Sequence, residues 1–228
     1  MTIQQNLMRE NPASSTRFIG FVALSYAASM IIQNAGFAVS GAPDYNTPIS
    51  IVLTYHAENQ GALAITSGLE TTNMVLLLLF VTALHGLIQR RGGKGADWSR
   101  LAVAAGATLS ALSALFIATH IAVIVSASSL SEPNPAFELM WQLHAAIFTL
   151  VMPALGATFI GTALATHASG LTRSWHRALG VVGGSLAIVA GFGNLAIAGG
   201  SPILFVGVLG LAMWIVWVVA TGLRLIRG

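Results

Sequence analysis

The stretch GALAITSGLETTNMVLLLLFVTALHGLIQ, residues Gly61–Gln89, decides the fold class of this chain. It exceeds the ~20 mostly apolar residues that a helix needs to cross a bilayer. One residue departs from the pattern, because Glu70 carries a carboxyl group within the apolar run. A charge at bilayer depth costs about 2.5–3.5 kcal/mol on insertion scales. The stretch therefore predicts a membrane-spanning helix, and Glu70 is the first candidate for a functional residue.

The composition of the whole chain agrees with this prediction. Of its 228 residues, 55% are hydrophobic and 7% are charged, whereas a soluble domain carries about 25% charged residues. The basic residues fall in short runs rather than in one patch, which argues against a nucleic-acid partner. The absence of cysteine excludes disulfides, thiolate catalysis and cysteine-based metal centres. We expect a single integral membrane domain over residues 1–228, embedded in the lipid bilayer.

Hydropathy predicts an all-α protein with six membrane spans. The polar stretch before the first span and the length of that span favour a retained helix over a signal peptide. The expected spans are Phe18–Val39, Ala62–Gln89, Leu101–Ala127, Phe137–Thr166, Ala178–Ala198 and Ile203–Leu223. Pro153 is expected to kink the fourth span.

The charges of the loops predict the orientation. Lys and Arg occur before the first span, after the second, fourth and sixth spans, and in no other loop. Basic loops stay on the cytoplasmic side, so both termini are expected there. The Ala/Gly-rich composition, with arginine in excess of lysine, favours a bacterial inner membrane. The basic residues are Arg9, Arg17, Arg90, Arg91, Lys94, Arg100, Arg173, Arg177, Arg224 and Arg227.

The first extracytoplasmic loop, residues 40–61, is the one long connection. Asn46 could cap a short helix with Pro48 near its start, and such a helix would cover the mouth of the bundle; an ordinary extracytoplasmic loop is the alternative. His56 and Glu58 in the same loop are further candidates for a site. Trp141 is expected at the outer membrane interface.

Small residues predict close helix contacts in the fifth span. Gly180, Gly184, Ala187 and Gly191 recur at three- or four-residue spacing, and such faces let helix backbones approach closely. We therefore expect the fifth span to lie at the centre of the bundle.

Several spans carry polar side chains at a similar depth. With a rise of 1.5 Å per residue, Glu70 lies about 7 Å, and His120 and His144 about 10 Å, above the midpoints of their spans. Polar side chains in hydrocarbon face the bundle interior, so we expect a polar pocket in the outer half. Glu70, His144 and His120 are the catalytic candidates, and the ligand-binding candidates are Asn34, Asn73, Gln142, Asn194 and Trp214.

This polar layer admits several functions. Glu70 could act as an acid toward an isoprenoid or another lipophilic ligand. His120 and His144 could instead bind haem b in an electron-transfer subunit. A third alternative is an accessory subunit of a membrane complex, or a homo-oligomer, in which the layer only stabilises the bundle. The sequence contains no metal-binding H-E-x-x-H motif, no P-loop, no dinucleotide fingerprint, no G-x-S-x-G elbow and no lysine within a span. Cofactors therefore stay unassigned, and no metal site is predicted.

The sequence Tyr55-His56-Ala57-Glu58-Asn59, the Arg90-Arg91 pair and the Trp-rich last span resemble uncharacterised six-helix membrane proteins of actinobacteria. The Trp-His-Arg-Ala-Leu-Gly entry into the fifth span fits the same group. It is also similar to membrane cytochromes that bind haem b, although their full set of histidines is missing here. The resemblance implies a fold and no activity.

Overall fold

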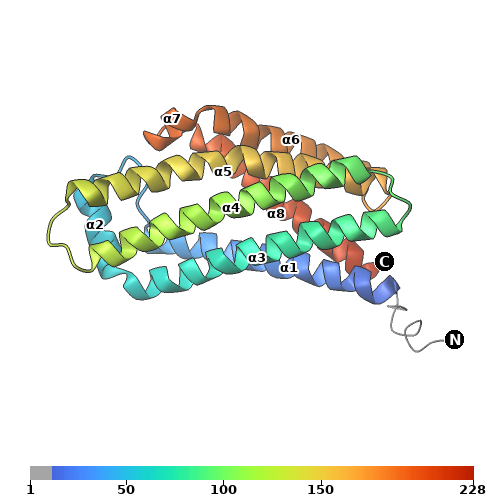
Figure 1. The fold of residues 1–228 in the computed structure, drawn as a ribbon, viewed down its shortest axis with the longest axis horizontal. Coiled ribbons are helices and arrows are strands. Elements are labelled where there is room, and N and C mark those ends of the chain that lie inside the picture. Colours follow the sequence, from blue (N-terminus) through green and yellow to red (C-terminus); the bar gives the residue numbers. More distant parts are fainter. Residues whose placement is uncertain (1–11) are drawn as a thin grey trace.

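The computed structural model describes residues 12–228, and this part of the chain contains helices and no strands (Figure 1). Six long helices fit a multi-pass membrane protein, as the sequence predicts. The helices are α1 (Pro12–Ser40), α2 (Ile49–Glu58), α3 (Gln60–Arg90), α4 (Ala96–Ala127), α5 (Pro135–Ala168), α6 (Ser174–Phe192), α7 (Asn194–Ala198) and α8 (Leu204–Arg227).

The longest helices, α3, α4 and α5, are longer than the hydrocarbon core is thick. The 34 residues of α5 span about 51 Å at 1.5 Å per residue, against a core of about 30 Å. The helix continues through Pro153. The predicted spans are confirmed within a few residues at most ends, since α3, α4 and α5 each include the segments expected from hydropathy.

The predicted fifth span is wrong at its end. It was expected to continue to Ala198, but α6 ends at Phe192, and the separate helix α7 follows Gly193. Glycine is a weak helix former, and Gly193 ends α6 and precedes α7. The span keeps its length because α6 begins earlier than expected, at Ser174.

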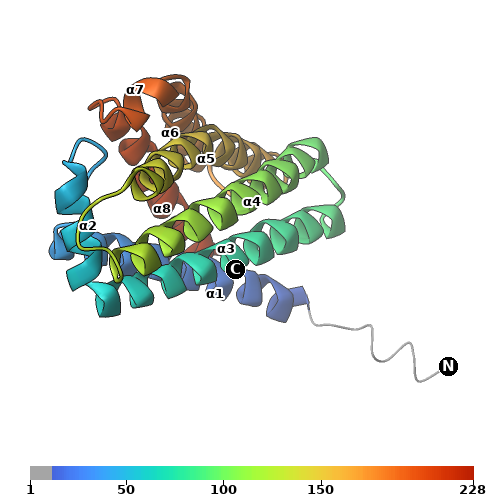
Figure 2. The ribbon, with the colours of Figure 1, turned by 60° about the vertical axis from the view of Figure 1, so that its left-hand side comes forward.

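The long helices lie side by side (Figures 1 and 2), and the contacts among the six of them close into a ring. Their packing order is α1, α3, α4, α5, α6 and α8, and α8 returns to α1. The fifth span is not central, contrary to the sequence prediction. In the most apolar stretch of α6, 33% of residues are buried, against 56% in α5. The fourth span, α5, is therefore the most enclosed helix of the bundle.

The glycines of α6 allow its backbone to pack closely against α5. A methyl group at Gly184 would lie 2.7 Å from the carbonyl oxygen of Gly156, and one at Gly191 would lie 2.5 Å from the ring of Pro153. Gly180 packs as closely against Ala163. The prediction of a small-residue face is therefore confirmed, and it fixes the α5–α6 pair.

The bundle has two distinct ends (Figure 1). At one end, here the α2 end, lie α2, α7 and the α4–α5 loop. The other, here the terminal end, carries the C-terminus and the start of α1. The Lys and Arg residues in the described part of the chain lie at or near the terminal end. Arg9 lies outside the described residues.

Aromatic side chains fill the middle of the ring. Trp214 and Trp217 stack with ring centroids 5.5 Å apart, and Phe80 and Phe159 meet both rings edge-on. These four side chains are fully buried. The indole nitrogen of Trp214 donates a hydrogen bond to the hydroxyl of Tyr26 at 3.2 Å. The layer closes the bundle beneath the polar residues of the α2 end.

The short helix predicted in the first long loop is present as α2, but its expected cap is wrong. Pro48 occupies the N-cap position and no side chain caps the helix. The amide of Asn46 donates instead to the carbonyl oxygen of Gly200, and so connects this loop to the α7–α8 loop. Val52, Leu53 and His56 of α2 are buried against the bundle.

Candidate functional site

A cavity of about 340 Å³ lies inside the α2 end of the bundle. Its walls come from α1, α2, α3, α4, α5, α8 and the α1–α2 loop. One part of the wall is polar and carries Glu70, His56, His120 and His144, and much of the rest is aliphatic or aromatic. Such a mixed wall in a volume of about 300–1,000 Å³ is typical of small-molecule sites.

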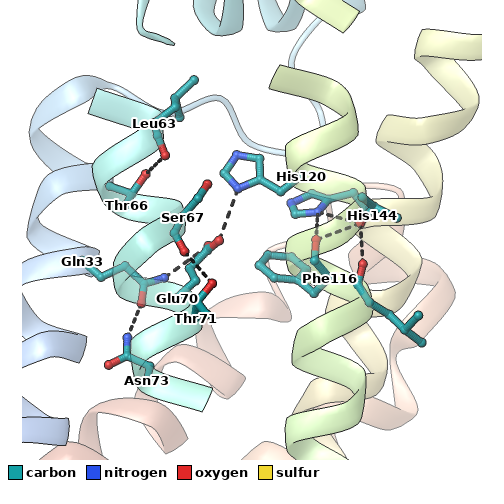
Figure 3. A network of polar contacts seen from close by, with 12 residues as sticks. Gln33, Leu63, Thr66, Ser67, Glu70, Thr71, Asn73, Phe116, His120 and His144 are labelled. Carbon is teal, nitrogen blue, oxygen red and sulfur yellow. Dashed lines mark hydrogen bonds and ion pairs between the residues drawn. The ribbon is translucent and has the colours of Figure 1, made fainter. Parts of the chain in front are cut away.

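Glu70 is buried, with 6% of its surface exposed, and it contacts two neighbouring helices (Figure 3). Its Oε2 lies 3.5 Å from Nδ1 of His120 on α4, and its Oε1 accepts a hydrogen bond from the side-chain amide of Gln33 on α1 at 3.3 Å. Gln33 in turn accepts a hydrogen bond from the amide of Asn73 at 2.5 Å. Two amides thus donate in series toward the carboxyl group, an order that stabilises negative charge there.

The three histidines of the wall form a cluster. The ring centroid of His120 lies 5.1 Å from that of His144 and 5.6 Å from that of His56. His56 comes from α2, His120 from α4 and His144 from α5. The short helix therefore contributes directly to the site, as well as covering this end of the bundle.

Each histidine is oriented through Nδ1. In His56 this atom lies 2.7 Å from the carbonyl oxygen of Val52, and in His144 it lies 3.2 Å from that of Phe116. In His120 it faces Glu70. No hydrogen bond within residues 12–228 uses Nε2 of these three rings.

Burial also changes the acid–base properties of the groups that α2 and its preceding loop bring to the site. It lowers the pKa of His56 to about 4; His120 lowers it further, and the Val52 carbonyl partly offsets the change. His56 is therefore neutral at pH 7. Burial, with a smaller contribution from Glu70, raises the pKa of Tyr45 above its ordinary value, so its hydroxyl keeps its proton.

Aromatic rings line the wall next to the histidines. Trp141 stacks on His144 at 5.4 Å between centroids, and Phe116 stacks on its other side at 4.0 Å. Tyr45 contacts both Trp141 and His144. Trp141 is 8% exposed and lines the cavity, so its side chain faces the interior of the bundle rather than the surrounding lipid. Aromatic rings at span ends are typical of interfaces, and sequence gives no signal that this one turns inward.

The structure brings together five of the eight predicted site residues. Glu70, His120, His144, Asn34 and Asn73 line the cavity. Of these, Asn34 is exposed and donates only to the Met30 carbonyl of its own helix. His56 joins them, whereas Glu58, two residues along α2, is exposed and lies outside the cavity wall.

Three predicted residues lie elsewhere. Gln142 is exposed on α5 and donates to Glu138 one turn away. Asn194 is exposed at the start of α7 and caps its own backbone at Leu195. Trp214 belongs to the aromatic layer below and reaches the cavity only through Tyr26. Shared depth does not fix helix rotation, which explains Gln142. Asn194 falls beyond the break that ends α6, and Trp214 lies below the cavity, at a different depth.

The site offers no preformed metal centre. Among residues 12–228, no group of three or more His, Asp or Glu is placed to hold a metal ion. The arrangement of His120 and His144 also does not suit a haem between them. Axial ligands point at one another across the macrocycle, but these rings lie only 5.1 Å apart and tilted by 31°, with Phe116 packed against both.

No protein-family model, curated protein or solved structure matches this chain. Its function must therefore be argued from the site, because a fold by itself does not imply an activity.

Proposed function

We propose that the protein binds a lipophilic small molecule in the cavity at the α2 end. The observation that carries this proposal is the cavity itself, whose 340 Å³ combine a buried carboxyl group with apolar walls. An occupant would place its polar group near Glu70 and His120, and its apolar part along Met74, Leu77 and Leu109. Isoprenoids and other lipid-like molecules have this shape and polarity.

Burial of Glu70 supports a functional role over a purely structural one. Among residues 12–228 no hydrogen bond reaches its Oε2, which lies 3.5 Å from Nδ1 of His120, although the residue is almost fully enclosed. An unsatisfied buried polar group costs about 1–3 kcal/mol, more when charged. A side chain that only held the bundle together would satisfy both oxygens. A ligand in the cavity would supply the missing partner.

An enzymatic role for this site uses Glu70 as an acid. A proton on the carboxyl group would pass to the bound molecule, and His120, 3.5 Å away, would be the group that returns it. The accessory-subunit alternative needs no ligand at all. Ligand binding is therefore the first property to test.

The test uses 1-decanol as the probe and a variant that fills the cavity. The protein is placed in phosphatidylcholine nanodiscs, and its thermal unfolding midpoint is measured with and without decanol. Ser113 lines the cavity, and its neighbour Ala114 is exposed on the outside of α4, so Ser113→Phe and Ala114→Phe form a matched pair. Decanol should raise the midpoint of the wild type and of Ala114→Phe, but not of Ser113→Phe. An equal response of all three proteins would contradict binding in the cavity.

A further inference from the structure

The polar wall of the cavity presents several hydrogen-bond acceptors beside the hydroxyl of Tyr45. Among the described residues that line the cavity there is no Lys or Arg, and Glu70 is the single carboxyl group. Asn73 adds a carbonyl oxygen, Oδ1, which is buried and accepts no hydrogen bond from the part of the chain that the structure describes. The basic residues of the described chain lie instead at or near the terminal end of the bundle.

The orientation of the histidines adds two more acceptors. A carbonyl oxygen only accepts hydrogen bonds, so Nδ1 of His56 must carry the hydrogen that it shares with Val52. Nδ1 of His144 lies 3.2 Å from the carbonyl oxygen of Phe116 and 3.3 Å from the hydroxyl of Thr119. Because that hydroxyl donates to backbone carbonyls, the contact with Phe116 assigns the same tautomer to His144. In a neutral ring the other nitrogen then has a lone pair. Nε2 of both side chains is therefore an acceptor without a partner in the described part of the protein.

The aromatic part of the wall favours positive charge as well. The faces of Trp, Tyr and Phe rings attract cations within about 6 Å of the ring centroid. Tyr45, Trp141 and Phe116 surround His144 in this wall, next to His120 and Glu70. A carboxyl group, two imidazoles and aromatic rings thus line one region of the cavity.

We infer that the ligand of this cavity is a lipophilic amine whose protonated nitrogen binds between Glu70, the imidazoles of His56 and His144, and the aromatic wall. An ammonium group supplies both the positive charge and the N–H donors that these groups lack. Its hydrocarbon part occupies the apolar wall toward Leu77 and Leu109. This inference rests on the proposed function, and it specifies the chemical class of the ligand.

The experiment compares three probes with the same chain and different head groups: decylamine, decanol and decanoate. Each is titrated into the wild-type protein in phosphatidylcholine nanodiscs at pH 7, and thermal shift against concentration gives an apparent Kd. Decylamine should bind at least tenfold more tightly than decanol, and decanoate should bind least. Tighter binding of decanol or decanoate would overturn the inference and leave the proposed function intact, whereas no binding of any probe would overturn both.

Two carboxyl groups at the α2 end provide matched variants. Glu70→Gln removes the charge inside the cavity, and Glu58→Gln makes the same change on the exposed face of α2. Decylamine should bind about 10- to 100-fold more weakly to Glu70→Gln, which is the usual range for a lost hydrogen bond to a charged group. Its affinity for Glu58→Gln should equal that for the wild type. Decanol binding should survive in Glu70→Gln, which shows that this variant is folded. Equal loss of decylamine binding in both variants would contradict the assignment to Glu70.

A second variant tests the aromatic wall independently of Glu70. Tyr45→Leu should weaken decylamine binding by about 2- to 30-fold, as loss of a cation–π contact does, and should leave decanol binding within a factor of two. Zn²⁺ alone serves as the competing probe. If Zn²⁺ stabilises the wild type and decylamine does not, the histidine cluster is a metal site and the amine inference is wrong.

Discussion

Gln33 connects Asn73 to Glu70, and the cost of removing it measures how much the polar network stabilises the protein. In Gln33→Leu, the amide of Asn73 loses its acceptor and Oε1 of Glu70 loses its donor. We expect a loss of about 1–3 kcal/mol, the usual cost of leaving buried polar groups unsatisfied. Chemical unfolding in mixed micelles measures this loss. Asn34→Leu on the same helix is the control, because its side chain bonds only to its own helix; a similar loss there would contradict the prediction.

His56 makes the stability of the protein depend on pH. Its pKa is about 4 in the folded protein and about 6.5 when unfolded, so the unfolded chain takes up the proton first as the pH falls. The neutral His56 therefore contributes to the free energy of unfolding in full above pH 6.5. This contribution, as much as about 3 kcal/mol, is lost as the pH falls from about 6.5 to 4. His120 on α4 is the titratable side chain packed against His56, and Tyr55 is its neighbour on α2.

The measurement compares unfolding midpoints of the wild type and His56→Gln at pH 7.5 and pH 4.5. Both proteins retain Glu70, His120 and His144, so the difference in their pH dependence isolates His56. The wild type should lose more stability on acidification than His56→Gln. Parallel losses would mean that His56 does not titrate as the structure indicates.

Among the elements, the contact between α5 and α6 is the least tolerant of added volume. A methyl group at Gly184 would lie 2.7 Å from the Gly156 carbonyl oxygen and 2.6 Å from Ile160, so Gly184→Ala should destabilise the bundle by about 1–3 kcal/mol. Gly68 on α3 has open space around it, and Gly68→Ala should be neutral or stabilise by up to about 1 kcal/mol through helix propensity. Thermal unfolding of both variants tests the contrast, and equal effects would contradict the close helix contact.

The sequence predicts the helices well because a bilayer imposes one rule on all of them. Their lengths and apolar content follow from hydrocarbon thickness and from the need to satisfy backbone hydrogen bonds. It misses the end of α6 at Phe192, because apolar residues continue into α7 and only Gly193 signals the break. It also places α6 at the centre, since small residues indicate close contact but not how many neighbours a helix has.

The site is predicted less completely than the helices. Helical spacing places Glu70 and Asn73 on one face, and depth brings His120 and His144 to their level; all four line the cavity. Depth also selects Asn194, which is exposed, as is the other ligand-binding candidate Gln142. The sequence does not predict that Tyr45 and Trp141 line the cavity, because their place in the wall depends on how the α1–α2 loop folds back onto α5.

The basic loops and the cavity lie at opposite ends of the molecule. The α3–α4 loop with Lys94 lies at the terminal end, and the α4–α5 loop with Ser129 lies at the α2 end (Figure 1). Basic loops remain in the cytoplasm, so we predict that the terminal end is cytoplasmic and that the cavity lies in the extracytoplasmic half.

The chain has no cysteine, and the side chains of Lys94 and Ser129 are exposed, so Lys94→Cys and Ser129→Cys each introduce one accessible thiol. In intact cells, a membrane-impermeant maleimide should label Ser129→Cys, and should label Lys94→Cys only after the cells are opened. Labelling of Lys94→Cys alone in intact cells would invert the orientation and place the cavity in the cytoplasmic half, while labelling of both would contradict the six-helix ring as a membrane-spanning unit.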